Sequence, residues 1–187
     1  MNKITLKWWY LITQTVYKRG FHRIGAKSVI YKPLQIDSAN SIYIGDGVYI
    51  AAGSWLMGET KEGLTCSIKD STTIGHFAHI IAKHSVTIEN DVLIADKVFI
   101  SDCTHGYEDI NAPVIKQDIK LLSPVVIGEG SWLGENVCVC GASIGKHCVI
   151  GANSVVTTDI PDYCVAVGSP ARVVKRYDFE KNEWVKV

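Results

Sequence analysis

Residues 127–156 read IGEGSW, LGENVC, VCGAS, IGKHCV, IGANSV and V, so a branched aliphatic residue returns at every sixth position, with one five-residue step. The second position of each unit is usually Gly, and the fifth is small, as at Ser131, Cys148 and Ser154. A period of six excludes an amphipathic helix, whose apolar residues return about every 3.6 positions. Self-similarity at a fixed period is instead the sequence signature of a solenoid.

The same repeat extends almost to the start of the chain. Aliphatic residues stand six apart in sets of three, and the sets follow one another: Ile24, Ile30 and Ile36; Ile44, Ile50 and Leu56; Ile68, Ile74 and Ile80; Ile88, Ile94 and Ile100. Three units make one triangular coil, whose aliphatic side chains point inward and stack on their equivalents in the next coil. The repeat therefore predicts an all-β fold, a left-handed parallel β-helix, which departs from the usual right-handed crossover rule.

The composition of the 187-residue chain suits one globular domain with a well-buried core. Hydrophobic residues make up 47% and charged residues 20%, and the zero formal net charge argues against a general nucleic-acid binder. No signal peptide is evident, and no apolar run approaches the ~20 residues of a spanning helix, so we expect a cytoplasmic protein. Before the first acidic residue, Asp37, the chain carries only cations: Lys3, Lys7, Lys18, Arg19, Arg23, Lys27 and Lys32.

Residues 1–23 do not follow the repeat and predict a short amphipathic helix. Ile4, Trp8, Leu11 and Thr15 fall on one helical face. We expect this face to pack on the first coil as a cap, because a solenoid end would otherwise leave backbone groups unpaired. The alternative is that Trp8, Trp9 and the nearby cations contact an anionic membrane, which would place the protein at the inner face of that membrane.

Two further departures complete the organisation of the chain. The repeat spans residues 24–167 and is interrupted at about 101–125 by an insertion that carries His105 beside Gly and aromatic residues. Long loops on a rigid scaffold are usually functional or disordered, so this insertion is the best candidate for a site. Residues 168–187 form a tail, which predicts a tight turn and then a short strand or hairpin.

Together these motifs resemble the hexapeptide-repeat acetyltransferases, in particular the O-acetyltransferases of bacterial surface polysaccharides, with the galactoside and maltose acetyltransferases as cousins. The resemblance covers nearly the whole chain. Its most specific parts are the His105 insertion and the tail motif Gly168-Ser169-Pro170-Ala171-Arg172. It implies transfer of an acetyl group from acetyl-CoA to a sugar hydroxyl, without a metal, by a homotrimer with sites between neighbouring subunits.

The resemblance also implies roles for individual residues. His105 matches the catalytic base that takes the proton of the attacking hydroxyl, and Asp102 or Glu108 would orient it. The backbone N–H of Glu135 matches the oxyanion donor. The residues matched to acetyl-CoA are Trp132 at the pantetheine channel, Gly151, Ala152 and Thr157 along the solenoid, and Arg172 and Lys175 at the 3′-phosphate. Thr158 replaces a lysine of the cousins, so one cationic phosphate contact is missing. His76 and His79 are the candidate acceptor-site residues, because the cousins' sugar-contacting asparagine has no counterpart here.

Two alternatives to a sugar O-acetyltransferase stay open from the sequence. The γ-class carbonic anhydrases are left-handed β-helices that hold zinc through three histidines, and His76, His79 and His84 lie close in sequence here. Their Gly-His-x-x-x-x-His spacing would, however, need a histidine at Ile81. The other alternative is a structural trimer without catalytic activity, which binding of acetyl-CoA would contradict.

Overall fold

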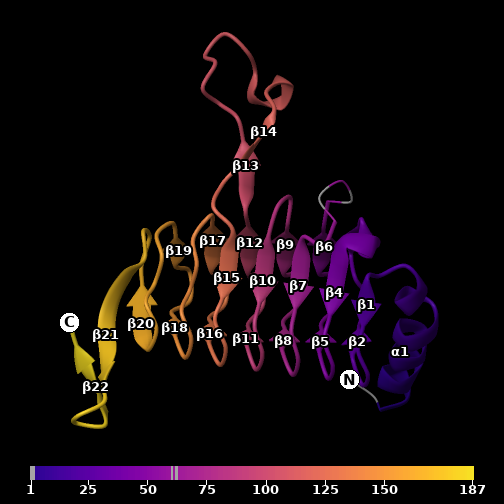
Figure 1. Cartoon of the computed structure of the whole chain (residues 1–187), viewed down its shortest axis with the longest axis horizontal. Helices are drawn as coiled ribbons and strands as arrows, with labels where there is room; N and C mark the ends of the chain where they lie inside the picture. The colour runs from indigo at the N-terminus through magenta and orange to yellow at the C-terminus, as the bar shows by residue number, and fades with distance from the viewer. Residues whose placement is uncertain (1–2, 60, 62) are drawn as a thin grey trace.

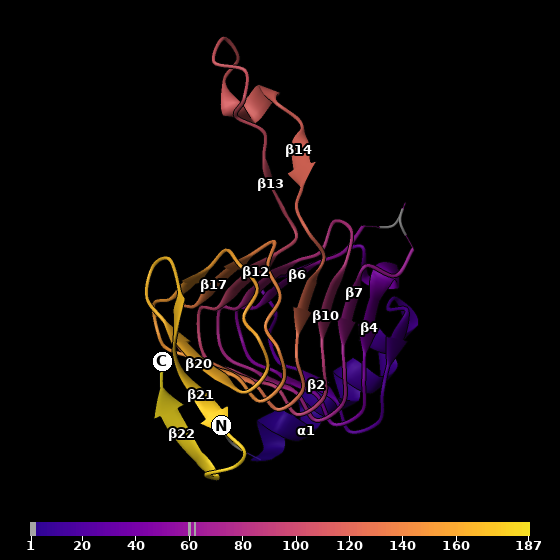
Figure 2. The same cartoon turned by 60° about the vertical axis from the view of Figure 1, so that its left-hand side comes forward.

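The repeat builds a β-solenoid of about seven turns, which the computed structural model describes for residues 3–59, 61 and 63–187. Figure 1 shows the coils side by side along one axis, with helix α1 (Lys3–Thr15) at one end and the C-terminal strands at the other. An arm leaves the middle of the solenoid at a steep angle, as Figure 2 shows from a second side. The parallel β-helix with a short N-terminal helix, an inserted loop and a tail is therefore confirmed.

The three faces of the solenoid are three sheets, named here A, B and C, in which each strand pairs with its equivalent in the next coil. Sheet A consists of β1 (Arg23–Ile24), β4 (Ile42–Ile44), β7 (Cys66–Ile68), β10 (Val86–Ile88) and β15 (Val125–Ile127). Sheet B consists of β2 (Val29–Ile30), β5 (Tyr49–Ile50), β8 (Thr73–Ile74), β11 (Leu93–Ile94), β16 (Trp132–Leu133), β18 (Val149–Ile150), β20 (Cys164–Val167), β21 (Arg172–Asp178) and β22 (Glu183–Lys186). Sheet C consists of β3 (Gln35–Asp37), β6 (Trp55–Met57), β9 (His79–Ile81), β12 (Phe99–Ser101), β17 (Cys138–Cys140) and β19 (Val155–Val156).

The predicted aliphatic positions form three straight columns through the core. Register pairing places one member of each set directly opposite the next, so that Ile24, Ile44, Ile68, Ile88 and Ile127 form one column, Ile30, Ile50, Ile74, Ile94, Leu133 and Ile150 a second, and Ile36, Leu56, Ile80, Ile100, Val139 and Val156 a third. All of these except the half-buried Ile36 are essentially inaccessible to solvent. Because each coil buries its aliphatic face only against its neighbours, stability is shared along the stack.

Tight turns join the sheets, and they need residues in the left-handed region. Asn136 and Asn153 occupy equivalent turns in successive coils with φ of 61° and 59°. The Asn136 side-chain amide donates a hydrogen bond to the Asn153 side-chain oxygen (2.9 Å). Asparagine tolerates this backbone conformation better than most residues, so the turn chemistry agrees with the repeat.

Helix α1 lies across the open end of the first coil, but it uses a different face from the one expected. The Thr13 hydroxyl is fully buried and accepts a hydrogen bond from the Ile30 N–H (3.0 Å), and the Gln14 amide donates to the Gly25 and Ser28 carbonyls. Trp9 packs edge-on against Tyr31. The prediction that the stripe of Ile4, Trp8, Leu11 and Thr15 packs on the first coil is wrong, because these four residues are exposed on the opposite side of the helix. Among the described residues, no helix is long and apolar enough to span a membrane.

The arm begins directly after β12. Strands β13 (Cys103–His105) and β14 (Ile119–Leu121) pair in antiparallel register, and the segment between them carries the short 3-10 helix η4 (Val114–Lys116). The Gln117 side chain stabilises the tip by hydrogen bonds to the backbone of Asp109 and Ala112.

Two other 3-10 helices, η1 (Tyr17–Arg19) and η2 (Ala39–Ser41), lie near the first coil. At the far end, β20, β21 and β22 form an antiparallel extension of sheet B.

Candidate active site

His105 ends β13, at the root of the arm, and its side chain is exposed. Antiparallel pairing places it opposite Ile119, and the next residue, Gly106, donates a hydrogen bond to the Asp118 carbonyl (2.9 Å). A Cβ on Gly106 would lie 2.9 Å from that same carbonyl oxygen, so the strand can cross here only with glycine. The Gly that follows His105 thus lets the two arm strands approach closely and fixes the position of the histidine.

A cavity of about 450 Å³ lies between His105 and sheet C. Its walls come from the outward side of β6, β9, β12 and β17 together with both arm strands; the lining residues are Trp55, Met57, Ile81, Lys83, Phe99, Ser101, Cys103, Thr104, His105, Ile119 and Cys140. We call this the His105 cavity. It is mostly apolar, with His105 and Lys83 as its ionisable nitrogen-bearing groups. The sequence interpretation missed Trp55 and Phe99, although large aromatic residues at outward positions of the repeat could have indicated them.

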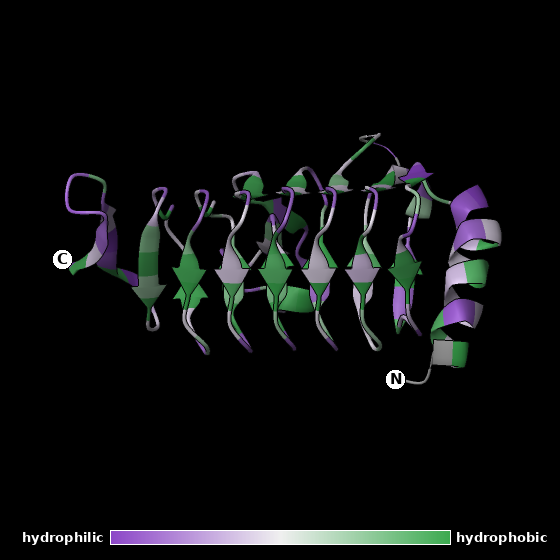
Figure 3. Cartoon of the chain, turned by 90° about the horizontal axis from the view of Figure 1, so that it is seen from below, coloured by the Kyte–Doolittle hydropathy of each residue, from purple (hydrophilic) through white to green (hydrophobic). Residues whose placement is uncertain are grey.

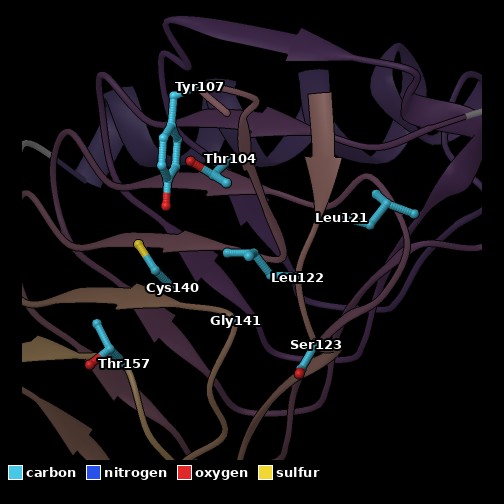
Figure 4. Close-up of a pocket in the computed structure, with 8 residues that line it drawn as sticks. All are labelled: Thr104, Tyr107, Leu121, Leu122, Ser123, Cys140, Gly141 and Thr157. Atoms are coloured by element: carbon cyan, nitrogen blue, oxygen red, sulfur yellow. The ribbon is translucent and has the colours of Figure 1, made fainter. Parts of the chain in front are cut away.

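A second cavity, of about 670 Å³, lies on the other side of the arm root. Figure 4 shows its eight lining residues, with Tyr107 extending from the arm towards Cys140 and with Thr157 on the neighbouring part of the solenoid. Thr104 and Cys140 line both cavities, so the arm root separates them. Among the residues assigned to acetyl-CoA, Thr157 is the one that shares a cavity with the residues next to His105.

The Asp102 side chain binds backbone groups at the root of the arm and does not contact His105 in the described chain. Its carboxylate is fully buried and accepts hydrogen bonds from the backbone N–H groups of Lys83 (2.8 Å), His84 (2.7 Å) and Ser85 (2.5 Å). A buried carboxylate needs such partners, because an unpaired charge away from water is costly. Asp102 therefore fastens the arm to the turn that follows β9, and it has no described contact with the imidazole.

Glu108, the other candidate for orienting His105, is also engaged elsewhere. Its carboxylate forms an ion pair with Lys120 on β14 and accepts a hydrogen bond from the Tyr107 N–H (2.9 Å). The Lys120 ammonium group, more than any other neighbour, lowers the pKa of Glu108 to about 2. The pair ties the two sides of the arm together just beyond His105. In the described chain, neither predicted carboxylate contacts His105.

A second group of predicted residues gathers at the corner between sheets B and C. His76, Asp96, Glu135 and Ala152 occupy equivalent turn positions in four successive coils. The turns are joined by the hydrogen bonds Lys97 N–H to His76 O, Asn136 N–H to Asp96 O and Asn153 N–H to Glu135 O. A Cβ on Gly134 would lie 2.7 Å from the Ala152 nitrogen, so only glycine allows this close stacking. Gly151 similarly leaves room for the Val167 side chain.

The Glu135 backbone N–H points to no acceptor within the described part of the chain, whereas its carbonyl accepts from Asn153. Its side chain forms an exposed ion pair with Lys97 (2.8 Å). An N–H without an internal partner at a tight turn is free to donate to a ligand.

Sheet B connects this corner to the basic tail. Trp132, Val149, Val165 and Lys175 are successive register partners across β16, β18, β20 and β21, and Trp132 and Lys175 are exposed. At the usual strand spacing of about 4.8 Å, Trp132 and Lys175 lie roughly 14 Å apart. Arg172, at the start of β21, is also exposed and bonds to the Ala171 carbonyl. Trp132, Arg172 and Lys175 thus lie on one solvent-facing surface.

In a single chain, His105 and Glu135 lie beyond opposite ends of two neighbouring strands of sheet C. Strands β12 and β17 are parallel neighbours, with Phe99 opposite Cys138. Glu135 precedes the start of β17, whereas His105 follows the end of β12. A base and an oxyanion donor must both lie close to the reacting carbonyl. One chain therefore contains both groups but does not bring them together.

The two candidate acceptor histidines differ in their surroundings. His79 lies on β9, in register between Trp55 and Phe99 of the cavity wall, and packs edge-on against Trp55 with ring centroids 5.5 Å apart. His76 lies at the corner between sheets B and C, where its Nδ1 is 3.2 Å from the Asp96 carboxylate. Among the described residues, no three His, Cys, Asp or Glu side chains gather as a metal-binding group.

Comparison with known proteins gives a consistent result. Residues 124–158 match the family described as the hexapeptide repeat of succinyl-transferase. WbbJ of Escherichia coli strain K12, named as a lipopolysaccharide biosynthesis O-acetyl transferase, is 37% identical over 183 residues, which cover 94% of this chain and 91% of WbbJ. A galactoside O-acetyltransferase of the same organism is 29% identical, over 92% of this chain and 73% of its own length.

Two solved structures share the fold. The N-acyltransferase AntD of Bacillus cereus, in complex with dTDP-4-amino-4,6-dideoxyglucose and coenzyme A, superposes with a TM-score of 0.74 at 18% identity and covers 90% of this chain and 91% of its own. A hexapeptide-repeat acetyltransferase of Vibrio cholerae in complex with acetyl coenzyme A gives a TM-score of 0.62 at 22% identity, over 94% and 87% of the two chains. At these identities the likeness shows the fold alone. The match to WbbJ spans nearly both chains, and so the chain belongs to the hexapeptide-repeat acetyltransferases and is an acyltransferase.

Proposed function

We propose that the chain transfers the acetyl group of acetyl-CoA to a sugar hydroxyl of a surface-polysaccharide precursor, with His105 as the general base. The observation that carries this proposal is the position of His105, exposed at the root of a braced arm and lining a cavity of about 450 Å³. The similarity to WbbJ and to a galactoside O-acetyltransferase supports a saccharide acceptor.

His105 would remove the proton of the sugar hydroxyl as its oxygen attacks the thioester carbon. A sugar hydroxyl is a poor nucleophile near neutral pH, and imidazole accepts protons in this range. As the carbon–sulfur bond breaks, the leaving thiolate takes up the proton held by the imidazole. The Glu135 N–H, which has no internal acceptor in the described chain, would stabilise the negative charge that develops on the carbonyl oxygen.

We further propose that the working unit is a homotrimer, because one chain leaves its site incomplete. The arm carries exposed apolar side chains beyond its root, including Ile110, Val114 and Ile115. Exposed apolar surface of this kind commonly marks a protein–protein contact. Around a threefold axis parallel to the solenoid, the arm of one subunit would reach the corner between sheets B and C of the next, so His105 would meet the partner's copy of the Glu135 turn.

The acetyl-CoA site would then follow sheet B. Trp132 would line the pantetheine channel, Gly151, Ala152 and Thr157 would flank the cofactor, and Arg172 and Lys175 would meet the 3′-phosphate. The shared outward surface of Trp132, Arg172 and Lys175 supports this assignment. His76, on the same corner as Glu135, would lie nearer the reacting atoms than His79.

The test is release of free thiol from acetyl-CoA in the presence of a panel of sugars and lipid-linked glycans. His105→Ala should lower the rate about 10²–10⁴-fold on the best acceptor, which is the usual contribution of a positioned acid–base group. His22→Ala is the matched control, because His22 is exposed near the first coil, far from the arm. Wild-type turnover by the folded His105→Ala variant would rule out His105 as the base.

A further inference from the structure

Helix α1 presents an apolar face to solvent. Ile4, Lys7, Trp8 and Leu11 line a shallow depression on the side of the helix that faces away from the coils. Trp8 is 63% exposed and Leu11 is 52% exposed. The spacing of three and four residues places these side chains on one stripe. We call this stripe the outer face of α1; Figure 3 shows the helix lying across the end of the stacked coils.

The outer face is not needed to hold the helix in place. Attachment to the first coil uses the opposite side, through Thr13, Gln14 and Trp9. A tryptophan and a leucine left in water are unfavourable, because each would gain from removal of its apolar surface from solvent. The arrangement therefore calls for a partner that covers the outer face.

The charges near the outer face identify the kind of partner. Lys7 lies within the stripe, and Lys18 and Arg19 follow the helix as exposed residues. Within the described residues none of these three cations takes part in an ion pair, whereas Arg23 is already paired with Asp46. The chain has no acidic residue before Asp37. A second copy of the same face would set cations against cations, whereas an anionic surface would complement them.

We propose that the outer face of α1 docks the protein on an anionic lipid bilayer. A helix of 13 residues is about 20 Å long, which is too short to span a bilayer but suits a helix lying in the plane of the interface, with Trp8 and Leu11 in the acyl boundary and cations at the headgroups. In a homotrimer with its axis parallel to the solenoid, all three helices would face the same way, so the copies would bind together. Joint binding of the three copies depends on the proposed assembly, whereas docking of one chain does not.

The experiment is co-sedimentation of the full chain with vesicles of phosphatidylcholine alone or with one third phosphatidylglycerol, at low and high salt. We expect binding to the anionic vesicles at low salt and release at high salt, because each surface cation contributes about fivefold. Trp8→Ser combined with Leu11→Ser should lower the partition coefficient at least tenfold, and Lys7→Glu several-fold. Phe179→Ser is the matched control, since Phe179 is 68% exposed at the opposite end of the solenoid.

Several outcomes would overturn the proposal. These are no sedimentation with anionic vesicles at low salt, equal binding to both lipid mixtures, or unchanged binding by the Trp8→Ser and Leu11→Ser variant. Self-association of the free protein that this variant abolishes, without vesicle binding, would assign the face to a second copy instead. Thermal unfolding by circular dichroism verifies that each variant is folded. Vesicle binding does not depend on acetyl transfer, so its failure and failure of the proposed activity are separate results.

Discussion

The buried carboxylate of Asp102 accepts a hydrogen bond from the backbone N–H of His84 at 2.7 Å. Two more backbone N–H groups, of Lys83 and Ser85, bind the same carboxylate, so a single side chain joins the end of β12 to the turn after β9. The arm leaves the solenoid at this junction. The position of His105 thus depends on a residue three places earlier that need not take part in the reaction.

Replacement of Asp102 tests this clamp. Asp102→Asn should lower the free energy of unfolding by about 1–3 kcal/mol, because the amide NH₂ would face backbone donors and leave one of them unsatisfied. Urea unfolding of the purified variant measures the change. Asp91→Asn is a suitable control, since Asp91 is exposed on a turn. Equal stability of Asp102→Asn and the wild type would show that the three hydrogen bonds contribute no net stability.

The Glu108–Lys120 ion pair gives a prediction about pH. The pKa of Glu108 is lowered from 4.5 to about 2, first by Lys120 and then by backbone N–H groups. A lowered folded-state pKa means that the pair stabilises the arm above pH 4.5 and that this contribution disappears as the pH falls from 4.5 to about 2. Carboxyl titration by NMR should show the low pKa, and Lys120→Ala should bring it towards 4.5. An unchanged Glu108 pKa in that variant would contradict the pairing.

Arg172 and Lys175 of β21 should bind acetyl-CoA more tightly than dephospho-acetyl-CoA, which lacks the 3′-phosphate. Arg172→Ala combined with Lys175→Ala is expected to weaken acetyl-CoA about tenfold or more and dephospho-acetyl-CoA much less, because charge-assisted hydrogen bonds to the 3′-phosphate are lost only with the first ligand. Titration calorimetry measures both. Lys181→Ala, in the turn before β22, is the control cation. Equal weakening of the two ligands would place the phosphate elsewhere.

The paired thiols Cys138 and Cys140 should differ in reactivity from the core cysteines. Their sulfur atoms are 3.5 Å apart, and donation by Cys140 lowers the pKa of Cys138 to about 7 while the pKa of Cys140 rises. Burial raises the pKa of Cys66 to about 12. Iodoacetamide at pH 7.5 should therefore modify Cys138 well before Cys66, as followed by peptide mass spectrometry. Cys140→Ala should slow the modification of Cys138; an undiminished rate would show that the neighbouring thiol has no effect.

The core could be predicted from sequence almost residue by residue. A hexad repeat leaves one solution for an inward-facing aliphatic residue, and Ile30, Ile50 and Ile74 stack as that rule requires. Residue type marks only some of the turns, because Asn136 and Asn153 suit the left-handed conformation whereas Phe77 and Tyr163, which also adopt it, do not. These features are local and repeated, so each coil confirms the interpretation of the one before.

The face of α1 could not be predicted, and the reason is physical. Both sides of this helix carry large apolar residues, with Trp8 on one and Trp9 on the other, so hydrophobic periodicity does not choose between them. The choice is made by Thr13 and Gln14, whose hydrogen bonds satisfy backbone groups of the first coil. Such polar contacts between distant segments leave no periodic signal in a sequence.

The candidate site was only partly predictable for a similar reason. The insertion drew attention to His105, but its two sequence-predicted carboxylate partners, Asp102 and Glu108, bind other groups in the described chain. Which carboxylate meets which donor depends on the path of the arm, which has no repeat to constrain it. The wall formed by Trp55 comes from a coil far from His105 in sequence, and Trp55 becomes its neighbour only through stacking of the coils.

The place at which the arm leaves the solenoid has a consequence for substrate choice. The arm follows β12, three strands along sheet C from β3 in the coil that α1 covers, which is roughly 14 Å at the usual strand spacing. With α1 docked on a bilayer as proposed, the number of coils between α1 and the arm sets the distance from the bilayer at which a lipid-linked sugar can reach His105. Adding or removing one whole coil would change this distance by about 4.8 Å and would leave the residues of the arm unchanged.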